Sequence, residues 1–299
     1  MTTELDFFTR TFLPSQLQTM QLMNNYLTRK IDYLQPDITN AYDELPVWSA
    51  PFGLLLLDNF PIGEYTDYLD IGCGTGFPLL EIAQRLGNNC KSVGIDPWTE
   101  AVKRTQTKID TLQLDNISIL EGDASDIPFP ANHCDLITSN LGINNFEHPD
   151  NVLSECHRVL KTNGSLCLTT NLTGTFTEFY DLYRETLIDL GFEKYLPQFN
   201  EHIQHRGTEE SVKILIENNG FKIKNSVRSI YKMRFLNGSA FLNNSFIILG
   251  FISSWINMFQ ENDKPVFFDR FEHNLNEYSK KLGELILSIP MYYIECQKK

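Results

Sequence analysis

The fold is decided by the stretch Tyr68-Leu69-Asp70-Ile71-Gly72-Cys73-Gly74-Thr75-Gly76, where an apolar run leads directly into a glycine-rich turn. An apolar segment with helical spacing follows at residues 77–86. This order predicts a strand, a tight turn and a helix. Glycine suits such a turn because it adopts positive φ and lets a ligand approach the backbone. The first N–H groups of the helix are also free to bind, so we expect a binding site here.

The spacing of the glycines discriminates between cofactor classes. A dinucleotide fingerprint requires G-x-G-x-x-G, but the third position of that pattern is Phe77 and the last glycine is Gly76. A phosphate-binding loop would end in Gly-Lys-Ser/Thr, and no such lysine is present. The turn instead has the form D-x-G-x-G-x-G, which favours neither of those two cofactor classes.

Four further strands are expected after this turn. Residues 91–96 predict a strand that ends in Asp96, where an acid can accept hydrogen bonds from both hydroxyls of a ribose. Residues 117–120 lead to Asp123, and residues 134–140 end in Asn140. Residues 159–168 contain a turn signal at Asn163-Gly164, followed by a fifth strand. Helices are expected between the strands at residues 77–86, 98–112 and 151–159.

In order and spacing these segments resemble the class I S-adenosylmethionine (SAM)-dependent methyltransferases, with a type 11-like domain for small molecules. The resemblance covers roughly residues 60–235 and a last strand near the C-terminus. Thr162-Asn163 stands where the family's LKPGG turn has Pro-Gly, but Asn163-Gly164 still predicts a turn. The resemblance implies a Rossmann-like, doubly wound α/β sheet of seven strands, mostly parallel with an antiparallel last strand.

The resemblance also implies SAM as the cofactor and indicates which residues bind it. In the family the glycine loop wraps the methionine part of SAM, and an acid after the third strand meets the adenine amino group. An isolated aspartate is more often a solvated loop acid, but an ordered series of such motifs favours the cofactor interpretation. The residues implied are Asp70, Gly72, Cys73, Gly74, Gly76, Asp96, Pro97, Asp123, Ala124 and Asn140, with Trp48 from an N-terminal segment that folds over the cofactor in many members.

The remaining segments are expected to form a helical cap on this core. We assign residues 1–60, 171–206 and 237–287 to the cap, and residues 61–236 and 288–299 to the core, so that 171–206 belongs to both. Apolar periodicity predicts helices at 17–33, 51–59, within 171–206, and at 208–218, 237–260 and 265–287. Strands are expected at 221–235 and 290–296.

The cap is rich in aromatic residues, which allows three interpretations. They wall an apolar pocket for a small organic acceptor, or form a solid helical core, or build a homodimer face from residues 246–259. For the pocket we name Asn144, Tyr180 and Trp255 as substrate residues. His202 and His205 are the candidate general bases, although a surface position is the simpler reading. We expect His148 and His157 to be surface residues.

Composition and charge narrow the class of partner. The formal net charge is −13 and no basic stripe is evident, so nucleic-acid binding is disfavoured. Lys222, Lys224, Arg228, Lys232 and Arg234 alternate along one expected strand, where a solvated face is the simplest explanation. The six cysteines include no C-x-x-C pair and the first residues are acidic, which favours a reducing, cytoplasmic location. We expect no metal site, and residues 246–259 are too short to span a membrane.

Together these observations predict a methyltransferase that moves a methyl group from SAM to a small, partly apolar acceptor by in-line displacement. Two alternatives stay open. One is a SAM-binding enzyme with other sulfonium chemistry, because a fold does not fix a reaction. The other is a non-catalytic SAM-binding or scaffold protein, against which the intact Asp70, Gly72, Gly74, Gly76 and Asp96 argue. Detection of S-adenosylhomocysteine as product would separate these cases.

Overall fold

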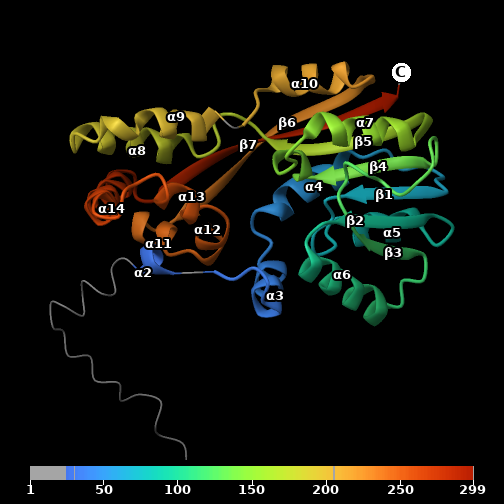
Figure 1. The fold of residues 1–299 in the computed structure, drawn as a ribbon, viewed down its shortest axis with the longest axis horizontal. Coiled ribbons are helices and arrows are strands. Elements are labelled where there is room, and N and C mark those ends of the chain that lie inside the picture. Colours follow the sequence, from blue (N-terminus) through green and yellow to red (C-terminus); the bar gives the residue numbers. More distant parts are fainter. Residues whose placement is uncertain (1–24, 30, 205, 299) are drawn as a thin grey trace, which may run out of the picture.

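The computed structural model describes residues 25–29, 31–204 and 206–298 of the 299-residue chain. Within these ranges one seven-stranded sheet has the order β3-β2-β1-β4-β5-β7-β6 (Figure 1). Strand β7 is antiparallel to both of its neighbours, and the other paired strands are parallel. The predicted doubly wound sheet with an antiparallel last strand is therefore confirmed. The strands are β1 (Asp67–Ile71), β2 (Lys91–Asp96), β3 (Ile117–Glu121), β4 (Cys134–Asn140), β5 (Leu160–Asn171), β6 (Phe221–Phe235) and β7 (Leu285–Lys298).

Helices cover both faces of the sheet, because successive side chains of a strand point to opposite faces. Tyr68 of β1 belongs to one apolar cluster with residues of α4 (Ser49–Asn59), α5 (Leu79–Leu86) and α6 (Thr99–Leu112). The next residue, Leu69, belongs to a second cluster with residues of α7 (Pro149–Val159) and α10 (Glu209–Asn218). Each cluster is closed to solvent, so the parallel part of the sheet is buried on both sides.

Several local signals determine where the elements begin and end. Thr208 caps α10, because its Oγ1 accepts a hydrogen bond from the Ser211 N–H at 3.1 Å. The expected helix at 237–260 is instead three short helices, α11 (Gly238–Leu242), α12 (Ser245–Gly250) and α13 (Ile252–Ile256). The reason lies in two asparagines, since the side chains of Asn237 and Asn244 cap new helix starts inside that range.

The structure differs from the sequence-based prediction at the start of β7 and at one additional helix, and one expected helix lies largely outside the described ranges. Helix α14 (Asp263–Leu282) stops at Gly283, where φ is +87°, so β7 begins at Leu285 instead of residue 290. Helix α3 (Pro36–Glu44) was not expected from the sequence. Of the helix expected at 17–33, the structure describes α2 (Asn25–Thr28).

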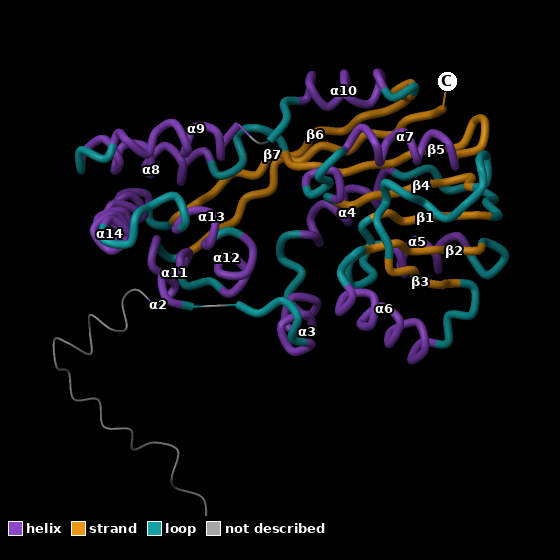
Figure 2. Tube along the Cα trace, in the orientation of Figure 1, coloured by secondary structure: helices purple, strands orange, loops and turns teal. Residues whose placement is uncertain are grey.

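A separate group of helices lies beyond the ends of the parallel strands. It comprises α8 (Thr177–Asp189), α9 (Leu196–Gln204) and α11 to α14, and the long strands β6 and β7 run into it (Figures 1 and 2). Its core is aromatic: Phe179, Tyr183, Trp255 and Phe271 are fully buried. The ring centroids of Phe179 and Trp255 are 4.3 Å apart, and those of Phe179 and Phe271 are 5.0 Å apart. These aromatics therefore form a packed interior.

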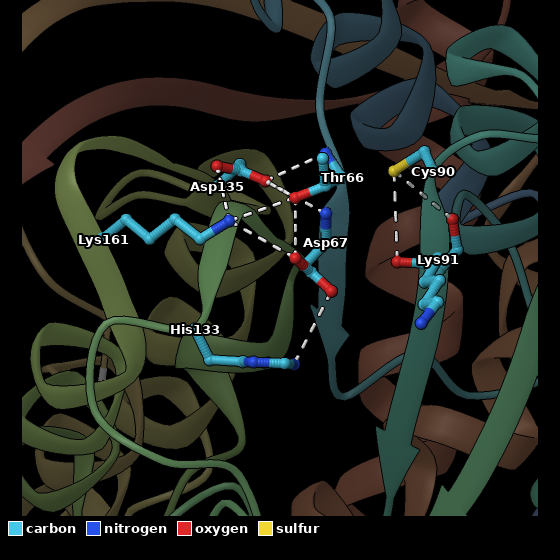
Figure 3. Close-up of polar contacts among 8 residues, drawn as sticks. Thr66, Asp67, Cys90, Lys91, His133, Asp135 and Lys161 are labelled. Carbon is cyan, nitrogen blue, oxygen red and sulfur yellow. Dashed lines mark hydrogen bonds and ion pairs between the residues drawn. The ribbon is translucent and has the colours of Figure 1, made fainter.

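The opposite end of the sheet is closed by a group of paired charges (Figure 3). The carboxylate of Asp135 accepts hydrogen bonds from the backbone N–H groups of Thr66 and Asp67 at 2.9 and 3.0 Å. Lys161 reaches both aspartates, at 2.9 Å from Asp135 and 3.3 Å from Asp67. His133 Nε2 lies 3.7 Å from Asp67. The charges at this end satisfy one another and fix the starts of β1 and β4.

Candidate cofactor site

A cavity of about 480 Å³ lies at the carboxyl ends of the parallel strands. This is where α/β sheets of this type bind ligands, because the strand order reverses there and the loops diverge. Its wall combines the glycine turn, the loops after β2, β3 and β4, and the N-terminal segment. The lining includes Tyr42, Trp48, Ser49, Gly72, Gly74, Asp96, Pro97, Trp98, Asp123, Ala124, Ser125, Asn140, Leu141, Gly142, Asn145, Phe146, Glu147 and His148.

The glycine turn leaves space for a ligand at Gly74. This residue has φ +53°, and a Cβ built on it would meet no atom within 4 Å. Its N–H donates to Asp96 Oδ2 at 2.7 Å, while the Trp98 N–H donates to Asp96 Oδ1 at 2.9 Å. Asp96 is thereby fixed at the cavity wall, and each carboxylate oxygen keeps a further lone pair for a ligand. Burial raises the pKa of this carboxyl group.

Asp70 lies beneath the turn and is only half satisfied. Its Oδ1 accepts a hydrogen bond from Thr138 Oγ1 at 2.6 Å, and that hydroxyl is 2.8 Å from the hydroxyl of Tyr68. Its Oδ2 is buried and has no hydrogen-bond partner in the described part of the chain. Burial, together with the nearby charge of Asp96, raises the pKa of Asp70 to about 7. A buried carboxylate oxygen without a partner is costly and points to a missing donor or cation.

The loop after β4 forms the opposite wall. Asn140 Nδ2 donates to the carbonyl of Ser49 at 3.1 Å, and Asn140 Oδ1 accepts from Thr169 Oγ1 at 2.7 Å. Asn140 thus ties the N-terminal segment to the sheet at the edge of the cavity. Gly142 must be glycine, because a Cβ there would lie 2.2 Å from Ser139 Oγ. The backbone of this loop is therefore drawn close over the end of β4.

The N-terminal segment forms a wall of the cavity and is held from two sides. Asp43, which follows the wall residue Tyr42, pairs with Arg104 at 2.8 Å and with Lys108 of α6. Lys108 also donates to the carbonyl of Thr75 in the glycine turn, at 2.8 Å. On the other side, the ring of Trp48 lies 5.6 Å from that of Phe246 and 5.1 Å from that of Phe251. The segment joins the glycine turn to the helical group.

The structure brings together most of the residues that the sequence associates with the cofactor. Cys73 does not line the cavity, because it is buried against Gly94, whose added Cβ would lie 2.7 Å from its sulfur. Gly76 faces Leu80 and Thr105, and Asp70 lies below the surface of the cavity. The implied residues that do line it are Gly72, Gly74, Asp96, Pro97, Asp123, Ala124, Asn140 and Trp48.

The residues named for substrate and catalysis lie elsewhere. Trp255 is fully buried, and its Nε1 donates to the hydroxyl of Tyr180 at 3.2 Å. That hydroxyl is 3.1 Å from His202 Nε2, so these three side chains form one chain of contacts inside the helical group. Asn144 lines a neighbouring cavity, and His205 lies outside the described residues. The wall of the cofactor cavity includes none of Trp255, Tyr180, His202 and Asn144.

Two titratable residues on the wall were not associated with the site from the sequence, although His148 is exposed as expected. Glu147 and His148 stand at the start of α7, and both line the cofactor cavity. His148 precedes Pro149, so the sequence marks a helix start there but gives no sign that its side chain faces a cavity. Their position after β4, the strand whose end carries Asn140, is the signal that could have indicated them.

The sheet order and its antiparallel last strand are those of the Rossmann-like fold found in methyltransferases. Residues 69–168 match the model of the methyltransferase domain family of type 11. In this part of the chain the sequence is therefore similar to that family. The cofactor of the family is SAM.

Relatives and solved structures agree with this assignment. Demethylmenaquinone methyltransferases of Bacillus cereus and Geobacillus stearothermophilus are 30% and 33% identical over 138 and 137 residues, or 45% and 44% of this chain. The match covers 58% of the length of each relative. A Bacillus halodurans C-125 protein has the same fold, with a TM-score of 0.53 at 17% identity, covering 82% of this chain and 98% of the other. The 4+2 cyclase SpnF gives 0.52 at 15%, covering 83% and 80%.

The chemistry of the cavity fits SAM, which carries a cationic sulfonium and a cationic ammonium group. The wall offers the carboxylates of Asp96, Asp123 and Glu147, and in the described ranges none of them forms an ion pair with the protein. The open space at Gly74 fits the same ligand. Among the described residues there is no cluster of three or more histidine, cysteine or acidic groups that could hold a metal ion.

No helix in the described part of the chain is both long enough and apolar enough to cross a bilayer.

Proposed function

We propose that this protein transfers a methyl group from SAM to a small organic acceptor. The observation that carries the proposal is the cavity at the carboxyl ends of β1, β2 and β4, where Gly74 is open and Asp96 is fixed by two backbone N–H groups. When bound, SAM supplies a methyl group on a sulfur that leaves readily. The protein must then hold the acceptor in line and exclude water.

The residues of the cavity would divide this work. Asp96 is placed to accept hydrogen bonds from the ribose, and Asp123, whose Oδ1 accepts from the Ser125 N–H at 2.7 Å, is held at the adenine end. Tyr42 and Trp48 cover the cavity from the N-terminal segment. We propose that residues 1–60, 171–206 and 237–287 act together as the cap, with Trp48 as the contact between them.

A general base is needed only if the acceptor is a protonated hydroxyl or amine. His202 and His205 stay the prediction from the sequence, but His202 contacts Tyr180 away from the cofactor cavity. We propose Glu147 and His148 as the better candidates, because both lie on the cavity wall next to the loop after β4. The acceptor must approach from this side, since the glycine turn occupies the other.

The homodimer alternative receives no support from residues 246–259. Phe246, Trp255 and Phe259 are 6%, 0% and 6% exposed, so their rings are already buried within one chain. These aromatic side chains do not line the cofactor cavity either. We therefore propose that the helical group contributes a rigid support for the N-terminal segment, and that the acceptor binds closer to β4 and β5.

The direct test is product analysis with full-length protein, isotopically methyl-labelled SAM and a library of small metabolites. Formation of S-adenosylhomocysteine in equal amount to a labelled product supports the proposal. SAM binding with turnover of a substrate but without S-adenosylhomocysteine would instead support other chemistry on this fold, of which the shared fold of a 4+2 cyclase is an example. Absence of SAM binding by calorimetry would contradict both.

A further inference from the structure

A row of three cavities runs from the cofactor site along the ends of β4 and β5. The cofactor cavity shares Phe146 and Glu147 with a second cavity of about 310 Å³. The second shares Arg206, Gly207 and Ser211 with a third, of about 520 Å³, beside α8 and the start of α10. The second cavity is thus bounded by the cofactor site on one side and by Arg206 on the other.

Arg206 is a cation held in place by its backbone and left open at its side chain. Its carbonyl accepts from Thr173 Oγ1 at 2.8 Å, and the adjacent carbonyl of Gly207 accepts from the Thr173 N–H at 2.9 Å. In the described ranges its guanidinium has no carboxylate within 4.0 Å and makes no hydrogen bond. By contrast Arg184, in the third cavity, donates to Asn200 at 2.8 Å and lies over the ring of Phe199.

The floor of the second cavity carries a network of amide and hydroxyl groups that includes free hydrogen-bond donors. Thr170 Oγ1 donates to Asn144 Oδ1 at 2.5 Å, Asn144 Nδ2 donates to Asn171 Oδ1, and Asn171 Nδ2 donates to Thr175 Oγ1 at 3.1 Å. Each amide oxygen accepts one of these bonds and keeps a second lone pair. Each amide nitrogen carries a second hydrogen that these bonds do not use. Asn171, Thr170 and Thr175 are at most 5% exposed, so the arrangement is fixed before any ligand arrives.

The charges of this row are separated along its length. Glu147 stands on the wall shared with the cofactor cavity, and Arg206 stands at the far side. The third cavity is lined by Asp181 and Arg184 as well as by Arg206, but neither Asp181 nor Arg184 lines the second cavity. A small molecule in the second cavity would meet a cation and amide N–H groups away from the cofactor. Guanidinium and amide donors are the groups that bind carboxylates and phosphates well.

We propose that the second cavity binds the methyl acceptor through a carboxylate or phosphate group, held by Arg206 with Asn144 and Asn171. This rests on the proposed function and narrows its substrate class to small anionic molecules. The anionic group lies at Arg206, and the atom that receives the methyl group points toward Phe146 and Glu147. Asn144, expected from the sequence to contact substrate, then does so as a donor to the anion.

The experiment uses full-length protein saturated with S-adenosylhomocysteine, and measures binding of phenyl phosphate and benzoate by calorimetry, with benzyl alcohol as the uncharged comparison. The variants are Arg206→Gln, Arg206→Lys and, as matched control, Arg228→Gln on the exposed face of β6. We expect Arg206→Gln to weaken at least one anion by about tenfold or more, because a charged hydrogen bond is lost. Arg206→Lys should retain part of the affinity, and Arg228→Gln all of it.

Three results would overturn the proposal. They are equal anion affinity in Arg206→Gln and wild type, an equal loss in Arg228→Gln, or no saturable anion binding by the wild type. Circular dichroism and the melting temperature show whether each variant is folded. The affinity for S-adenosylhomocysteine is measured in parallel and should not change. If the wild type does not bind S-adenosylhomocysteine, the proposed function fails. Anion binding by the Arg206 variants without cofactor still decides whether the anion site exists.

Discussion

Strand β1 carries two aspartates, Asp67 and Asp70, whose surroundings are opposite. Asp67, at the start of the strand, is paired with Lys161 at 3.3 Å and accepts from Thr66 Oγ1 at 2.7 Å. Partial burial acts to raise the pKa of Asp67, but these hydrogen bonds outweigh it and lower that pKa. Asp70 has one hydrogen bond, from Thr138, and an unpartnered oxygen, and its pKa is raised to about 7.

The same difference separates the two ends of the whole sheet. At the amino end Asp67, Asp135 and Lys161 neutralise one another (Figure 3). At the carboxyl end the buried Asp96 and the exposed Asp123 line a cavity, and neither forms an ion pair within the described residues. Paired charges stabilise a fold locally, whereas buried acids without partners persist where a ligand supplies the missing charge. The charges at the amino end are thus satisfied within the protein, whereas the buried carboxylate of Asp96 at the carboxyl end has no ion-pair partner among the described residues.

The largest effect is expected when two glycines in left-handed conformations are compared. Gly74 in the cofactor turn has φ +53° and Gly87 after α5 has φ +81°, and an added Cβ would meet nothing within 4 Å at either. Valine should strain both backbones, at a cost of about 1–3 kcal/mol. Only Gly74→Val should abolish SAM binding, by about 100-fold or more, because its side chain fills the ligand's space.

Calorimetry with SAM on both folded variants measures this difference. Gly87→Val serves as the control for strain and should bind SAM as the wild type does. Unchanged SAM affinity in Gly74→Val would remove the glycine turn from the cofactor site.

The next effect compares Asp96, the last residue of β2, with Asp135 near the start of β4. Asp96→Ala should weaken SAM by about 10- to 100-fold, since each lost charge-assisted hydrogen bond is worth about 1.5–3 kcal/mol. Asp135→Ala removes the partner of Lys161 at the other end, so it should lower the melting temperature and leave SAM affinity intact. Equal SAM affinity in Asp96→Ala and wild type would show that Asp96 is only a structural acid.

The core of the fold was predictable because local signals there agree with tertiary structure. Strands β2, β4 and β6 have the bounds that the sequence predicts, since apolar runs end at clear polar or glycine positions. The bounds of the elements in the helical group were harder to predict from the sequence. Its apolar residues are so dense that periodicity could not place Asn244 as a cap between α11 and α12. Nor could it show that β7 extends back to Leu285 to pair with the far end of β6.

The candidate site was predictable where one motif places backbone and ligand together. The turn from Gly72 to Gly76 and the acid Asp96 follow from strand ends, and Asp123 follows from the family resemblance. The proposed acceptor site in the second cavity was not predictable, because it is formed by loops that are distant in sequence and meet only in the folded protein. Glu147 and Arg206 are far apart in sequence yet line the same second cavity. The aromatics around Trp255 looked like a pocket wall but pack against one another.

The smallest expected effect is the pH dependence of stability that arises from the two aspartates of β1. The pKa of Asp70 is about 7 in the folded protein against an ordinary value of 3.8, so between these values the folded state holds a proton that the unfolded state has lost. The free energy of unfolding of the cofactor-free protein should therefore fall as pH rises from 4 to 7, with a contribution from Asp70 of up to about 1.4 kcal/mol per pH unit. Asp67 has a lowered pKa, so its contribution is present above pH 3.8 and is lost on acidification below it.

Denaturant unfolding of wild type, Asp70→Asn and Asp67→Asn across pH 3 to 8 separates the two contributions. Asp70→Asn should flatten the decline between pH 4 and 7, because the amide does not titrate. Asp67→Asn should keep that decline and lose part of the acid sensitivity below pH 4. Addition of SAM should flatten the wild-type curve as well, since a cationic ligand favours the ionised form of Asp70 and lowers its pKa. An identical slope from pH 4 to 7 in wild type and Asp70→Asn would mean that Asp70 is ionised already in the cofactor-free protein, and that the two ends of β1 do not differ in the way the unpartnered oxygen indicates.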